Sequence, residues 1–196
     1  MPTRVLPDAN VLHARTLRDW LLLLKDTGNA SMFHVCYTED ILAETIQSIR
    51  RRNPGLTGTE ITKIRDAIAG TMDGRIDDYP SGQDAVMLTD PFDRRIHAAA
   101  IPGSMGCVVS LDHGFTNLPT AVRDTLDYEI YTPDEFFLLI DDSSPRLVRA
   151  TLRRQILYFS GRGGAHPDFA GALVKSGCPA FAERITERCR EIALDQ

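Results

Sequence analysis

The chain has 196 residues, of which 43% are hydrophobic, which suits one domain with a sizeable core, or one domain with a small appendage. Its net charge of −5 argues against a uniformly basic nucleic-acid binder, but it leaves local basic patches open. The four cysteines form no CxxC pair, so we expect a reduced, cytoplasmic protein with neither a disulfide framework nor a zinc site. The apolar run Leu21 to Leu24 is far too short to span a bilayer, and we expect no membrane association.

The first half of the chain alternates strand patterns with helix patterns. Short apolar runs predict strands over residues 4–6 and 32–37. Apolar residues at helical spacing predict helices over residues 16–26, 39–52 and 60–72, and Thr38 is a suitable cap for the second. Residues 77–81 are polar and rich in turn formers, with room for a short strand.

The second half continues the alternation and then becomes helical. The pattern predicts a helix over residues 93–101, strands over 107–111 and 128–131, and a helix over 134–140. Residues 141–145 are typical of a linker, and helices are expected over 146–159, 168–175 and 180–193. Strands that alternate with helices predict an α/β fold with a central, mainly parallel sheet flanked by helices. We therefore expect a domain over residues 1–140 and a helical C-terminal extension over 141–196.

Acidic residues follow two of the predicted strands. Asp8 follows the first strand and Asp112 follows the strand over 107–111. In parallel sheets ligands gather at the carboxyl ends of the strands, so both acids are expected on one edge. Asp93 opens one helix and Glu44 lies at the edge of the apolar face of another. Carboxylates that converge repel one another, and a hard cation such as Mg²⁺ or Mn²⁺ is their natural counterion.

Each of these acids also has an ordinary structural explanation. Aspartate is common in turns and as a helix cap, which accounts for Asp8, Asp93 or Asp112 taken singly. Glu39 and Asp40 compete with Glu44, but acids in the first turn of a helix are stabilised there electrostatically. A phosphatase with an aspartate after its first strand would require a second aspartate two residues later, and that position is Asn10.

Five short motifs occur in a fixed order along the chain. They are "DANVL" at 8–12, "ILAETI" at 41–46, "DPFDRRIHAAAI" at 90–101, "VVSLDHGF" at 108–115 and "YTPDEFF" at 131–137. The ordered set resembles the PIN domains, and in particular the VapC-type toxin ribonucleases, over about residues 3–140. Each motif is short, so the specificity of the resemblance comes from their order and spacing.

The resemblance implies a PIN-like fold and a metal-dependent endoribonuclease. Carried over residue by residue, its catalytic acids and Mg²⁺ or Mn²⁺ ligands are Asp8, Glu44, Asp93 and Asp112. Asn10 and Ser110 match polar positions that support the cluster in the family. Asp90 is a rival for Asp93, which we prefer because it directly precedes an apolar helix face.

The resemblance also implies biological partners. PIN toxins of this kind cleave structured RNA, such as tRNA or ribosomal RNA, and each is held by a cognate VapB-like antitoxin. They commonly form homodimers. Two other functions remain open: a non-toxic RNA-processing nuclease of the same fold, and a metal-free scaffold that binds protein or RNA.

A basic segment stands apart from the acidic body of the chain. Residues 143–164 contain five arginines and no acidic residue, so they carry +5 while the rest of the chain carries −10. Arg146, Arg149 and Arg153 fall on one side of the predicted helix. This side is suited either to RNA phosphates or to ion pairs with acidic residues of the same protein.

Overall fold

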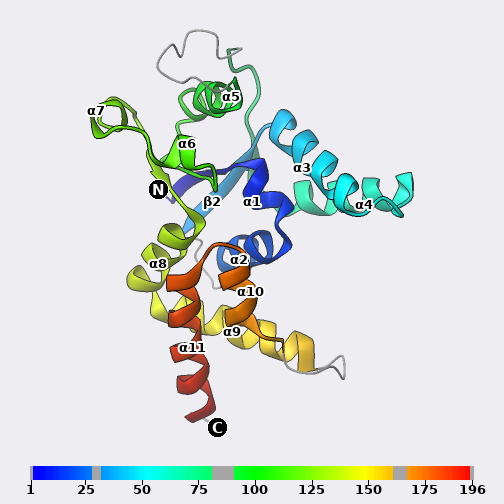
Figure 1. Ribbon diagram of the computed structural model, residues 1–196, viewed down its shortest axis with the longest axis vertical. Helices are drawn as coiled ribbons and strands as arrows, with labels where there is room; N and C mark the ends of the chain where they lie inside the picture. Colours follow the sequence, from blue (N-terminus) through cyan, green and yellow to red (C-terminus); the bar gives the residue numbers. More distant parts are fainter. Residues whose placement is uncertain (1, 28–31, 81–90, 161–166, 195–196) are drawn as a thin grey trace. The chain divides into compact units, whose positions relative to one another are not determined.

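The computed structural model describes residues 2–27, 32–80, 91–160 and 167–194, without the side chains of residues 91–93 (Figure 1). The described chain divides into two compact units. The sheet unit comprises Met1–His13 and Met32–Tyr131, and the helical unit comprises Ala14–Ser31 and Thr132–Gln196. This division differs from the expected boundary at residue 140, because helices α2 (Arg15–Asp26) and α8 (Pro133–Ser143) pack with the C-terminal helices.

Five strands among the described residues form one sheet with the order β3-β2-β1-β4-β5. They are β1 (Thr3–Pro7), β2 (Phe33–Tyr37), β3 (Gly74–Arg75), β4 (Cys107–Val109) and β5 (Glu129–Tyr131). Every pairing is parallel, for example Val5 with Val35 in β2 and Val5 with Cys107 in β4. The prediction of an α/β fold with a central parallel sheet is confirmed. The short strand expected near residues 77–81 lies slightly earlier, at β3.

The helices of the sheet unit begin where the capping residues allow. They are α1 (Ala9–His13), α3 (Glu39–Arg52), α4 (Gly58–Gly70), α5 (Pro91–Ala100), α6 (His113–Thr116) and α7 (Thr120–Arg123). Thr38 caps α3 as predicted, since its hydroxyl accepts a hydrogen bond from the N–H of Ile41 at 3.1 Å. Helix α4 starts earlier than residue 60 because Thr57 and Glu60 form a reciprocal capping box. The one-turn helices α1, α6 and α7 carry too few residues for a periodic pattern and were not predicted.

An aromatic cluster holds the helical unit together. This unit contains α2 and α8 with α9 (Pro145–Ser160), α10 (Phe169–Lys175) and α11 (Pro179–Leu194). The ring of Phe181 on α11 lies 5.2 Å from that of Trp20 on α2 and 5.1 Å from that of Phe137 on α8. Edge-on and tilted ring contacts of this kind stabilise a core beyond simple burial. No helix in the described ranges has the length and apolar character needed to cross a bilayer.

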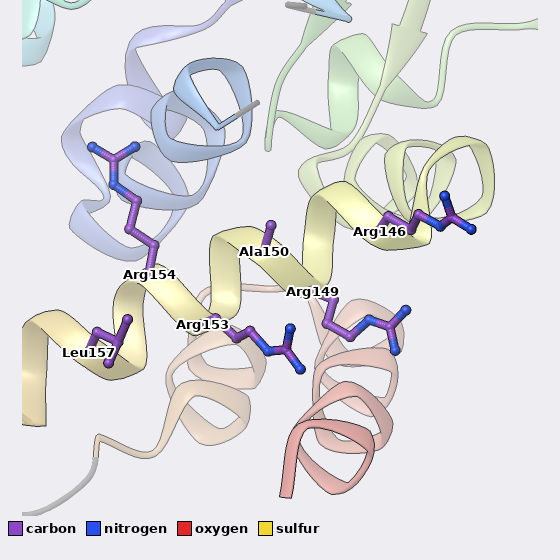
Figure 2. A pocket seen from close by; sticks show the side chains of 6 residues that line it. All are labelled: Arg146, Arg149, Ala150, Arg153, Arg154 and Leu157. Carbon is purple, nitrogen blue, oxygen red and sulfur yellow. The ribbon is translucent and has the colours of Figure 1, made fainter. Parts of the chain in front are cut away.

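Helix α9 has two different faces. Val148, Thr151, Leu152 and Gln155 are buried on one face. On the other, Arg146, Arg149, Ala150, Arg153, Arg154 and Leu157 line a shallow hollow (Figure 2). The periodicity predicted for this helix, with an apolar side and a basic side, is therefore present in the structure.

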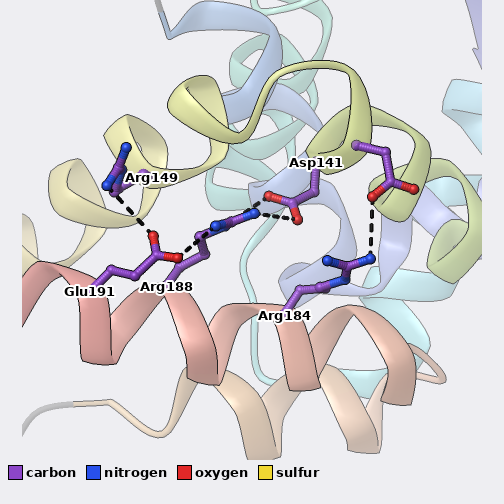
Figure 3. A network of polar contacts seen from close by, with 6 residues as sticks. Asp141, Arg149, Arg184, Arg188 and Glu191 are labelled. Atoms are coloured by element: carbon purple, nitrogen blue, oxygen red, sulfur yellow. Dashed lines mark hydrogen bonds and ion pairs between the residues drawn. The ribbon is translucent and has the colours of Figure 1, made fainter.

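The predicted linker at residues 141–145 is wrong. Helix α8 continues to Ser143 and α9 begins at Pro145, which leaves a single residue between them. Asp141 is fully buried and accepts two hydrogen bonds from the guanidinium of Arg188 on α11, at 3.1 and 3.0 Å (Figure 3). The polar composition that suggested a linker serves an internal ion pair instead, because paired charges tolerate burial that single charges do not.

Candidate functional site

The strand order of the sheet reverses between β1 and β4. From β1 the chain continues to β2 on one side, and from β4 it continues to β5 on the other. Such a reversal leaves a crevice beyond the carboxyl ends of the two strands, where ligands commonly bind. Asp8 directly follows β1 and Ser110 directly follows β4. The N–H of Asp8 donates to the carbonyl of Val109 at 2.9 Å, which joins the two strand ends.

Three side chains form a hydrogen-bonded network at these strand ends. The hydroxyl of Ser110 donates to Oδ2 of Asp8 at 2.7 Å, and the amide of Asn10 donates to the same oxygen. Asn10 also donates to the Ser110 hydroxyl at 3.2 Å, while its own amide oxygen accepts from the N–H of Leu111 at 3.0 Å. Because three of these four hydrogen bonds join the β1 end to the β4 end, the network fixes the orientation of the Asp8 carboxyl.

Asp8 occupies a site that resists ionisation. The residue is only 9% exposed, and this burial raises the pKa of its carboxyl above the usual value. The hydrogen bonds from Ser110 and from the N–H groups of Ala9 and Asn10 oppose that rise in pKa, and the charge of Asp112 adds to it. A cation bound beside Asp8 would offset the loss of solvent around its carboxylate and the repulsion from Asp112. An aspartate that serves only in a turn has no need of such a cation.

A cleft of about 460 Å³ opens beside Asp8 in the sheet unit. It is lined by Asp8, Thr38, Asp40, Ile41, Ala43, Glu44, Gln47, Arg95 and Ile96. The structure thus places Glu44 and Asp8, which are 36 positions apart in the sequence, on one cleft. Arg95 lines the same cleft and supplies a positive charge there.

The acids that compete with Glu44 have separate contacts. Glu39 forms an ion pair with Arg65 of α4. Asp40 lines the cleft, and its Oδ2 accepts a hydrogen bond from the hydroxyl of Tyr79 at 2.8 Å. Glu44 therefore shares its place on the cleft with one of its two rivals.

Asp112 lies beside the network but has a capping role. Its Oδ1 accepts a hydrogen bond from the N–H of Gly114 at 2.7 Å, which caps the short helix α6. Its own N–H donates to the Ser110 hydroxyl at 3.0 Å. Asp112 is not among the side chains that line the cleft, so its contact with the network runs through Ser110.

The third expected acid is at the edge of what the structure describes. Asp93 belongs to α5, but its side chain is outside the described residues, and Asp90 is outside them entirely. His97, one turn after Asp93, has its Nδ1 2.9 Å from the hydroxyl of Tyr128. The rings of His97 and Tyr128 also pack against each other, and burial lowers the pKa of His97. These contacts give His97 a structural role in the sheet unit.

Three polar residues that line the cleft were not considered as site residues from the sequence. Arg95 stands in the "DRRIHAAAI" motif, where its charge was a usable signal. Gln47 follows Glu44 by three positions, which places both on one helix face. Thr38 was recognised only as a cap, because a sequence does not show that a cap also lines a cleft.

Among the side chains that the structure describes, no group of three histidine, cysteine or acidic residues is arranged to hold a metal ion. Asp93 is not among these side chains. Comparison of the chain with models of known protein families finds no match, and comparison with curated proteins finds none either. The resemblance to PIN domains therefore rests on the ordered motifs alone.

Proposed function

We propose that the chain is a PIN-like, metal-dependent endoribonuclease and that its site is the cleft beside Asp8. The observation that carries the proposal is the pairing of Asp8 with Glu44 on one cleft at the strand-order reversal. The hydrogen-bonded Asp8–Asn10–Ser110 network agrees with the supporting positions that the family resemblance implies. Asp93 is the proposed third acid, since it precedes the cleft residue Ile96 by three positions in α5.

The donor set fits a hard divalent cation. Asp8 and Glu44 offer carboxylate oxygens, and burial raises the pKa of the Asp8 carboxyl, so a bound cation would favour its charged form. Asp112 is proposed as an outer contributor, because its Oδ1 already caps α6. Bound Mg²⁺ or Mn²⁺ would supply polarisation of an RNA phosphodiester and activation of a water for hydrolysis.

The protein's own residues have separable tasks in this proposal. Asn10 and Ser110 hold the Asp8 carboxyl in one orientation, so it needs no rearrangement when the substrate arrives. Arg95 lines the cleft and would attract the anionic phosphodiester, which two acids alone would repel. The cleft walls from α3 and α5 restrict which part of an RNA reaches Asp8.

The test is cleavage of a labelled structured RNA by purified variants in the presence of Mn²⁺. Asp8→Asn is expected to lower the rate at least 100-fold while the fold is retained. Asp40→Asn is the matched control, because it makes the same chemical change on the same cleft at a residue bonded to Tyr79. Cleavage by Asp8→Asn at the wild-type rate would refute the assignment.

A calorimetric titration with Mn²⁺ separates the nuclease from a metal-free scaffold. Wild type is expected to bind the ion, and Asp93→Asn is expected to bind it much more weakly. Absence of binding to wild type would favour the scaffold, whose function would be to hold protein or RNA.

We further propose that the protein is cytoplasmic and acts as the toxin of a toxin–antitoxin pair, with a VapB-like partner and a homodimeric state. Induced expression in a bacterial host tests toxicity. Growth arrest by wild type that Asp8→Asn abolishes is the expected result. Unchanged growth with an enzyme that is active in vitro would favour an RNA-processing role.

A further inference from the structure

The basic face of α9 is a continuous stripe along the helix. Arg146, Arg149, Ala150, Arg153, Arg154 and Leu157 follow the spacing i, i+3, i+4, i+7, i+8, i+11, which puts them on one face. We call these six residues the α9 stripe. Together they line a hollow of about 540 Å³. No cysteine, histidine or acid takes part in this lining, so the hollow offers positive charge and apolar surface only.

The arginine side chains of the stripe point in two directions. Figure 2 shows the guanidinium groups of Arg146, Arg149 and Arg153 extending the same way, while Arg154 extends to the opposite side. Ala150 lies between Arg149 and Arg153 along the helix, and Leu157, which is 72% exposed, lies beyond Arg154. Leu157 therefore adds apolar surface at the end of the row of charges.

The four arginines of the stripe differ in their contacts, since Arg149 and Arg153 have partners and Arg146 and Arg154 have no acidic partner among the described residues. Glu191 pairs with Arg149 at a long 3.6 Å, and it also pairs with Arg188 at 2.8 Å (Figure 3). No carboxylate of the described residues is paired with Arg146 or Arg154, and both side chains are exposed. The stripe therefore keeps a positive charge that salt bridges of its own unit leave in place.

An aromatic ring extends the stripe at its C-terminal end. Tyr158 is four residues beyond Arg154 and is 50% exposed, with its ring edge-on to that of Phe159 at 5.2 Å. Arginines with an exposed aromatic ring beside them form the usual surface for a nucleic-acid strand, since guanidinium forks bind phosphates and rings stack on bases. An acidic protein segment would need the charges but would gain little from the ring.

From this arrangement we propose that the α9 stripe binds the phosphate backbone of single-stranded nucleic acid, with Tyr158 stacking on a base. The site belongs to the helical unit and is separate from the cleft beside Asp8. It does not depend on the proposed cleavage chemistry, because backbone binding requires neither the cleft nor a metal ion. Its specificity is for a polyanion with bases, not for a particular sequence.

The magnitude of the effect follows from counterion release. For single strands the logarithm of the binding constant falls with the logarithm of salt concentration at about −0.7 per phosphate neutralised. If all four arginines bind phosphates, with Arg149 and Arg153 exchanging their present contacts for a phosphate, the expected slope is about −3. Arg146→Gln/Arg154→Gln removes two contacts and should reduce the slope to about −1.4. The same relation predicts a loss of affinity of about 20-fold at 0.1 M salt.

The experiment measures binding of a fluorescein-labelled 20-nucleotide oligo(U) RNA by anisotropy in EDTA, so that cleavage plays no part. Lys175→Gln/Arg190→Gln is the matched control, because it removes two exposed positive charges of the same unit outside the stripe. The stripe variant should lose about 20-fold in affinity, and the control should lose less than 3-fold. Tyr158→Ala should weaken RNA binding about 5-fold with its salt slope unchanged.

Three outcomes would overturn the proposal. The first is a stripe variant that binds RNA as wild type does, with a circular-dichroism spectrum and urea midpoint that show it is folded. The second is an equal loss in the control, which would indicate a response to net charge only. The third is binding of poly-glutamate of matched charge as tight as that of RNA, which would identify an acidic protein segment as the occupant. Each outcome leaves the cleavage test of Asp8 unaffected.

Discussion

Replacement of Ser110 by alanine removes the hydroxyl that joins the two strand ends. This hydroxyl donates to Asp8 at 2.7 Å and accepts from the N–H of Asp112 at 3.0 Å and the amide of Asn10 at 3.2 Å, in a site with no solvent exposure. A hydrogen bond to a charged group contributes about 1.5–3 kcal/mol and a neutral one about 1 kcal/mol. Allowing for the bond that Asn10 keeps to Asp8, the free energy of unfolding should fall by about 3 kcal/mol.

The same substitution acts on the ionisation of Asp8. Hydrogen bonding to Ser110 is the largest influence that lowers the pKa of Asp8 against the rise caused by burial. Loss of the bond should therefore raise that pKa further, so the carboxyl would ionise at a higher pH than in wild type.

Urea denaturation at pH 7 in EDTA measures the stability, and carbon-13 NMR of the carboxyl group measures the pKa of Asp8. Ser176→Ala is the matched control, because the Ser176 hydroxyl makes one neutral bond, to the carbonyl of Ala172 at 2.8 Å. Its expected loss is about 1 kcal/mol. A loss below 1 kcal/mol in Ser110→Ala, with the pKa of Asp8 unchanged, would refute the view that this hydroxyl organises the site.

Three further predictions concern charged groups. Burial raises the pKa of Asp8 in the folded state, so the folded protein is stabilised when this carboxyl is protonated. That stabilisation is fully present below pH 3.8, the pKa of the unfolded state, and is lost as the pH rises through the folded-state pKa. In EDTA, Asp8→Asn should therefore raise the free energy of unfolding at pH 7, by about 1.4 kcal/mol for each unit by which folding raises the pKa of Asp8. A gain in stability that persists at pH 3.5 would contradict this reasoning. Arg188→Leu leaves Asp141 buried and unpaired and should lower the free energy of unfolding in urea by about 3 kcal/mol. The double variant Asp141→Leu/Arg188→Leu should lose less, and the reverse order would refute the ion-pair account. The carboxylate of Asp134 accepts hydrogen bonds from the first N–H groups of α11 at 3.1 and 2.8 Å. Asp134→Ala should therefore lower the free energy of unfolding by about 1 kcal/mol. An unchanged urea midpoint would show that this cap does not stabilise the helix.

Local pattern alone was enough for the longer elements. The apolar spacing of α2 and the Thr38 cap of α3 place those helices within a residue or two of their observed bounds. Such signals succeed because helix periodicity and capping involve residues at most four positions apart. The expected linker at residues 141–145 failed for the opposite reason, since the partner that makes Asp141 an interior residue is 47 positions away at Arg188.

For the candidate site, the sequence by itself determined which side chains are available: acids after two apolar runs, Asn10 two positions after Asp8, and a helix face with four arginines and no acid. Only the tertiary structure decided which of them meet. The parallel pairing of β1 with β4 brings Ser110 to Asp8 across 102 positions, and the cleft brings Glu44 to the same place. The reversed strand order and the burial that raises the pKa of Asp8 are properties of the sheet as a whole, because they depend on which distant segments become neighbours.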